Sequence, residues 1–69
     1  MSTKVVILEK QKNGELVTID EREWTMDMVA LLNHANYLTV NDAEYEMLEG
    51  RLNVNRGAFE LLVVSADKP

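Results

Sequence analysis

Cysteine is absent from this chain of 69 residues, and histidine and tryptophan occur once each. Without thiols the chain can form neither disulfides nor thiolate metal sites, and a zinc site would depend mainly on carboxylates, which is an unusual ligand set. We therefore expect no metal and no cofactor. The two serines, Ser2 and Ser65, lie near the ends of the chain, so the sequence does not indicate a Ser-His-Asp triad with His34.

Long hydrophobic runs are also missing. The run from Met28 to Leu32 has five residues, far below the roughly 20 that a membrane-spanning helix needs. Only four consecutive apolar residues precede Glu9, which is too few for the hydrophobic segment of a secretory signal. Together with the lack of cysteine, these features predict a cytoplasmic protein that does not contact membranes.

Basic residues are scarce in the middle of the chain, where Arg22 is the one base among eight acids. This stretch carries a formal charge of −7, whereas the whole chain carries −5. A field of that sign repels nucleic-acid phosphates and anionic lipids, and it attracts a basic protein. We therefore expect no direct binding of nucleic acid, and a basic protein is a candidate partner. The eight acids are Asp20, Glu21, Glu23, Asp27, Asp42, Glu44, Glu46 and Glu49.

The dipeptide Asn13-Gly14 is the most informative local signal. It separates two strand-like runs, Lys4 to Lys10 and Glu15 to Asp20. A favoured two-residue hairpin turn needs positive φ at both central positions, and Asn followed by Gly meets that need at low steric cost. The sequence therefore predicts an antiparallel hairpin with this two-residue turn, in which Lys10 opposes Val17.

A helix is predicted from Met26 to Ala35. Thr25 has the side chain of an N-cap residue, and Trp24 and Val29 have the spacing of a hydrophobic staple around it. An apolar stripe at helical spacing follows, which we assign to the core. Its members are Met28, Leu31, Leu32 and Ala35.

Two structures are open for residues 42–52. A helix would begin after Asn41 and end at Gly50, whereas a strand would need a bulge near Leu48 to Gly50 to account for the change of apolar phase. We favour the strand. The segment Ala58 to Ser65 is predicted to be a strand that is apolar on both sides, and such a strand is either central or paired across a subunit interface.

These elements predict a single α+β domain over residues 1–69. The expected fold is a small antiparallel sheet with one helix packed on one face, in the order strand, strand, helix, strand, strand, strand. The alternative order is strand, strand, helix, helix, strand.

The expected function is that of a small non-enzymatic protein-interaction or regulatory module. A domain of this length buries only about 60% of its unfolded surface, so we expect reinforcement by a second copy, as a homodimer. The size suggests an accessory protein of a bacterium or phage. The candidate partner contacts are Trp24, Leu62, Val64, Glu44 and Glu46.

Two other functions are considered. The acidic stretch would suit a nucleic-acid mimic that inhibits a DNA-binding protein, provided that most of the carboxylates share one surface. An enzyme or ligand-binding subunit assembled across a dimer interface would require His34 beside a carboxylate in a shared cleft. No catalytic residue is assigned.

Overall fold

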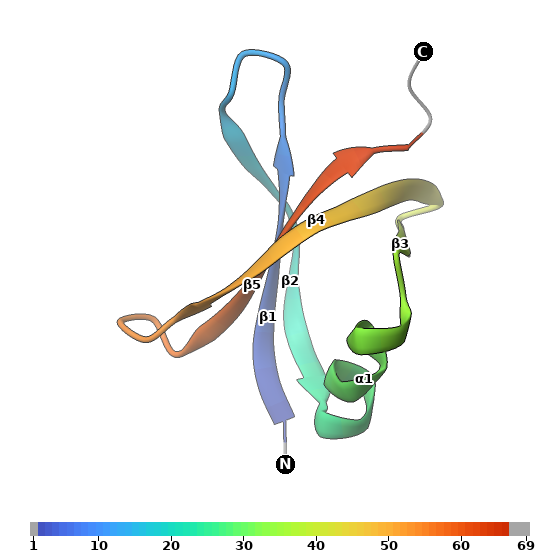
Figure 1. The fold of residues 1–69 in the computed structure, drawn as a ribbon. Helices are drawn as coiled ribbons and strands as arrows, with labels where there is room; N and C mark the ends of the chain where they lie inside the picture. The colour runs from blue at the N-terminus through green and yellow to red at the C-terminus, as the bar shows by residue number, and fades with distance from the viewer. Residues whose placement is uncertain (1, 67–69) are drawn as a thin grey trace.

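The computed structural model describes residues 2–66, which form five strands, one α-helix and one 3₁₀ turn (Figure 1). The strand order across the sheet is β2-β1-β5-β4-β3. The elements are β1 (Ser2–Lys10), β2 (Leu16–Thr25), α1 (Met26–Leu31), η1 (Leu32–His34), β3 (Tyr37–Val40), β4 (Ala43–Asn53) and β5 (Ala58–Ser65).

The sheet is mixed and curled, so the prediction of a small antiparallel sheet with one helix packed on one face is wrong. β1 pairs with β5 in parallel, while the other three pairings are antiparallel. Consecutive strands reverse direction along the chain, so the first and the fifth run the same way. Both are apolar on their two sides and pair at the centre, and this pairing must be parallel.

The core lies on the concave side of the curled sheet and is formed by side chains of the two central strands, β1 and β5. Val5, Ile7, Leu61 and Val63 are buried there. The other elements add half-buried apolar side chains around this cluster. They are Ile19, Trp24, Val29, Leu32, Leu38, Val40, Tyr45, Met47 and Phe59.

The helix lies at one end of the curl and does not extend across a face (Figure 1). With η1 it carries the chain from β2 to β3, which are the two opposite edges of the sheet. The α-helical part has six residues, Met26–Leu31, and is therefore shorter than the predicted span to Ala35. Its apolar stripe faces the core only in part, because Val29 and Leu32 pack inward while Met28 and Leu31 are half exposed.

The first hairpin forms, but with a different turn from the one predicted. Gly14 N donates to Gln11 O at 2.9 Å, and Gly14 has a φ of +89°. Positive φ is confined to Gly14 and Gly57 among the described glycines, and to Asn41 and Asp42 among the other described residues. The turn therefore has three loop residues and ends on a left-handed glycine.

This longer loop shifts the hairpin register by one residue, so that Lys10 opposes Leu16 and not Val17. A hydrogen bond of 3.0 Å from Glu15 N to Asn13 Oδ1 accompanies the loop. A bulge between Ile7 and Leu8 then allows Ile19 to reach the core. The two-residue turn with positive φ at both central positions occurs at Asn41-Asp42, where Val40 opposes Ala43.

Residues 43–53 form strand β4, so the helical alternative is excluded for this segment. The register with β5 shifts between Met47 and Glu49, which places the expected bulge at Leu48. Gly50 follows the bulge and lies under the ring of Phe59. A Cβ atom at this position would be 2.7 Å from Phe59 Cζ.

Gly50→Ala is predicted to destabilise the fold by about 1–3 kcal/mol, the usual cost of overpacking. The cause is steric, since a methyl group at position 50 would overlap the Phe59 ring. Urea unfolding measures the loss. The double variant Gly50→Ala/Phe59→Leu should lose less stability than the sum of the two single variants, and strict additivity would contradict the proposed clash.

Gly14→Ala is predicted to cost about 1–2 kcal/mol, because alanine must adopt the left-handed backbone at this position. Asn13→Ser should cost clearly less than Gly14→Ala, since Asn13 does not have positive φ and serine keeps an oxygen acceptor for Glu15 N. Thermal unfolding of both variants tests the turn type. Equal sensitivity at the two positions would instead favour the two-residue turn.

Candidate interaction surfaces

The described residues expose more large apolar side chains than they bury. Nine such side chains are exposed, whereas six apolar residues are buried. They gather near α1, near the β1–β2 hairpin tip and at the β4–β5 loop. The exposed ones are Leu16, Val17, Met26, Met28, Leu31, Tyr37, Leu48, Leu52 and Val54.

The first surface is an open apolar cleft of about 130 Å³ beside α1, which we call the helix cleft. One side of the cleft is formed by α1. Thr25 fixes the start of this helix as its N-cap, because its hydroxyl accepts a hydrogen bond of 3.2 Å from Met28 N. Trp24 precedes the cap and is half buried, with one side on the core. The cleft is lined by Trp24, Met28, Leu31, Leu32, Ala35 and Leu38.

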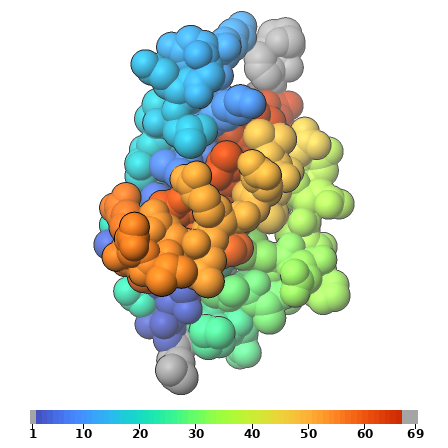
Figure 2. Space-filling view, turned by 60° about the vertical axis from the view of Figure 1, so that its left-hand side comes forward, coloured from blue at the N-terminus to red at the C-terminus, as the bar shows by residue number. Residues whose placement is uncertain are grey.

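The second surface is a larger open groove of about 1010 Å³, which we call the hairpin groove. It lies where the tip of the β1–β2 hairpin stands clear of β4 and β5 (Figure 2, top). Its apolar residues are Val17, Leu48 and Val64. Its charged residues are Glu9, Glu15, Lys10 and Lys12.

The predicted contact residues lie on two different sides of the molecule. Trp24 belongs to the helix cleft, and Val64 belongs to the hairpin groove. Leu62 is half buried on the convex face, on the same side of β5 as Val64. Glu46 is the cross-strand partner of Val64, and Glu44 lies two residues before it on β4. The structure therefore brings four of the five together and separates Trp24 from them.

Sequence reasoning missed Met28 and Leu31 as surface residues because the helical stripe was assigned to the core. The helix is too short and too far toward the end of the sheet for both to be covered. Leu48 was assigned only to a bulge. The bulge leaves it 48% exposed at the hairpin groove, and the change of apolar phase near this residue is the sequence signal for its position.

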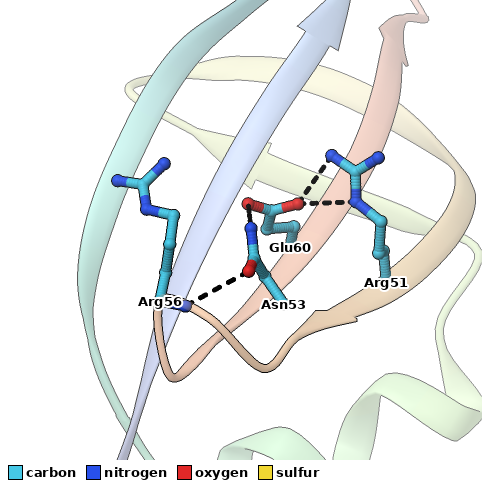
Figure 3. Close-up of polar contacts among 4 residues, drawn as sticks. All are labelled: Arg51, Asn53, Arg56 and Glu60. Carbon is cyan, nitrogen blue, oxygen red and sulfur yellow. Dashed lines mark hydrogen bonds and ion pairs between the residues drawn. The ribbon is translucent and has the colours of Figure 1, made fainter.

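A buried carboxylate, Glu60, holds together the convex side of the sheet (Figure 3). It is 3% exposed and is the third residue of β5. Arg51 Nε donates to Glu60 Oε1 at 2.7 Å, and Asn53 Nδ2 donates to Glu60 Oε2 at 3.1 Å. Asn53 Oδ1 in turn accepts from Arg56 N at 3.2 Å. The network therefore joins β4, β5 and the loop between them.

These partners stabilise the ionised form of Glu60. The hydrogen bond from Asn53, followed by that from Arg51, lowers the pKa of Glu60 below its ordinary value of 4.5. Burial opposes this effect but does not cancel it. On the edge strand β2, the hydrogen bond and charge of Lys4 lower the pKa of Glu21. Lys4 Nζ lies 2.7 Å from Glu21 Oε2.

Because the folded-state pKa of Glu60 is depressed, its stabilising contribution is present above pH 4.5 and is lost as the pH falls from there through the folded-state pKa. Glu60→Gln should therefore be less stable than the wild type at pH 7, and the difference should narrow at pH 3. Urea unfolding at both pH values measures it. Glu44→Gln, an exposed change on β4, is the control and should show little effect. A loss of stability in Glu60→Gln that is equal at pH 7 and pH 3 would contradict the depressed folded-state pKa of Glu60.

The eight central acids are divided among β2, α1, β4 and the turn before β4. Asp20, Glu21 and Glu23 lie on β2, at one edge of the sheet. Asp27 lies on α1 and Asp42 in the turn before β4. The remaining three, Glu44, Glu46 and Glu49, lie on β4. The registers place five of the acids on the convex side of the sheet, but on β2 and β4, which β1 and β5 separate. They are Glu21, Glu23, Glu44, Glu46 and Glu49.

Residues 2–66 contain neither an assembled metal site nor a pairing of His34 with a carboxylate. No group of three or more His, Cys, Asp or Glu side chains is arranged to hold a metal ion in this range. His34 is exposed in η1, and within the same residues it forms no ion pair or hydrogen bond with a carboxylate. No helix of the described chain has the length and apolarity needed to cross a membrane.

No protein-family model, curated protein or solved structure matches this chain. The two surfaces and their charges are therefore the features of the described residues that bear on function.

Proposed function

We propose that this chain is a small non-enzymatic protein-interaction or regulatory module that forms a homodimer through the hairpin groove. The observation that supports the proposal is the exposure of nine large apolar side chains against only six buried apolar residues. A core of that size contributes little net stability, so covering more apolar surface with a second copy has a large relative effect. The cysteine-free chain is consistent with a cytoplasmic location.

Charge favours the hairpin groove as the place where two copies meet. Its rim carries two acids, Glu9 and Glu15, and two bases, Lys10 and Lys12. In a two-fold symmetric contact each copy presents the same surface to the other, so a net-neutral rim can pair acids with bases and avoid repulsion between like charges. Val17, Leu48 and Val64 supply the apolar centre of this contact.

The proposal predicts a sedimentation mass of twice the 7.9 kDa of one chain, falling toward a single chain on dilution. The double variant Val17→Thr/Leu48→Gln should dissociate at higher protein concentrations than the wild type. Both positions are 44–48% exposed, so the changes should leave the monomer folded. Circular dichroism of each sample checks the fold.

A matched control uses the same two kinds of substitution at the opposite hairpin. Leu52→Gln/Val54→Thr changes side chains that are 68% and 80% exposed and do not line the groove. This variant should dimerise like the wild type. A wild-type protein that stays monomeric at high concentration would overturn self-association, and equal weakening by both double variants would overturn the choice of surface.

A further inference from the structure

The helix cleft has the size and lining of a site for one large apolar side chain. Its volume of about 130 Å³ is close to the roughly 150 Å³ of an apolar cavity that accommodates benzene. Two of its walls, Met28 and Leu31, are 49% and 60% exposed. An apolar group entering the cleft would remove these side chains from water, which is the main favourable contribution to such binding.

The helix cleft is lined by apolar residues, and the charged residues next to them in sequence, Glu23 and Asp27, are both acids. From Glu23 to Glu49, a stretch that includes every lining residue, there are six acids and neither lysine nor arginine. Arg22, the nearest base in sequence, is held by Asp20 through two hydrogen bonds of 2.8 Å. The electrostatic field around the cleft therefore favours a cationic occupant.

The same charges argue against a second copy of this chain as the occupant. A two-fold symmetric contact through the helix cleft would bring Glu23 and Asp27 of one copy toward the same acids of the other. Like charges brought together in this way oppose association. The lining of the hairpin groove has equal numbers of acids and bases and so presents less of this repulsion. The two surfaces therefore suit different partners.

We infer that the helix cleft binds an amphipathic segment of a basic protein. One large apolar side chain of the segment enters the cleft between Trp24 and Leu31, and its lysine or arginine residues face the acids around the cleft, Asp27 on α1 among them. Methionine at the rim suits such a contact, since its flexible side chain adapts to the shape of the anchor. The inference rests on the proposed function only in treating the protein as an interaction module.

Trp24 provides a direct measurement because it is the one tryptophan of the chain and lines the cleft. The probe is a short synthetic peptide of leucine and lysine, with leucines at helical spacing and no aromatic residue. Its addition should shift the Trp24 emission to the blue and protect it from acrylamide quenching, in a saturable way that weakens with salt. A peptide in which glutamate replaces lysine should produce neither change.

Leu31→Ser tests the location of binding, since it removes an exposed wall of the cleft and leaves the buried core intact. It should weaken binding of the leucine-lysine peptide by roughly tenfold or more. Leu52→Ser is the matched control, because Leu52 is 68% exposed and lies outside the cleft. This control should bind the peptide like the wild type.

The inference is overturned if both peptides shift the emission equally, if neither does, or if Leu31→Ser and Leu52→Ser bind alike. An emission shift that depends on protein concentration without peptide would assign the cleft to a second copy and also overturn it. Running the titration on Val17→Thr/Leu48→Gln separates the two proposals. Peptide binding should persist in that variant whether or not the wild type dimerises through the hairpin groove.

Discussion

The parallel pairing of β1 with β5 is the constraint on which the rest of the structure depends. These strands contribute all four side chains of the buried cluster, Val5, Ile7, Leu61 and Val63. Once they lie side by side, β2 and the β4–β3 hairpin can only add on the outside, as the sheet order shows. The helix and η1 must then carry the chain from one edge to the other, which places them at the end of the curl.

Much of the local structure was predictable because it depends on neighbouring residues. The apolar pattern of residues 58–65 predicts a strand, and the side chain of Thr25 predicts an N-cap. The change of apolar phase near Leu48 predicts the bulge. The turn at Asn13-Gly14 shows the limit of such reasoning. Two turn types use a left-handed glycine there, and they differ by one residue of register.

The topology and the surfaces were harder to predict. Sequence patterns indicate that Ala58–Ser65 is either central or paired across a subunit interface. They do not indicate which strand lies beside it, because that choice depends on packing between distant segments. Which apolar residues of the helix remain exposed depends on where the helix ends and on how the sheet curls. The 3.6-residue period of the apolar positions specifies neither. Glu60 shows the same limit. It is one acid within an apolar strand. Its burial is explained only by the hydrogen bonds from Arg51 and Asn53, which the sequence does not reveal.

The central pair of strands also has a consequence for how the protein is made. β1 and β5 are far apart in sequence, with Val5 paired to Phe59 and Ile7 to Leu61, so the buried cluster joins distant residues. Contacts of such long sequence separation form slowly, because the loop between them must close before they contribute. During synthesis on the ribosome, the β1–β2 hairpin has no core to pack against until β5 has emerged. Until then its apolar faces are open to water and to any molecule that meets them.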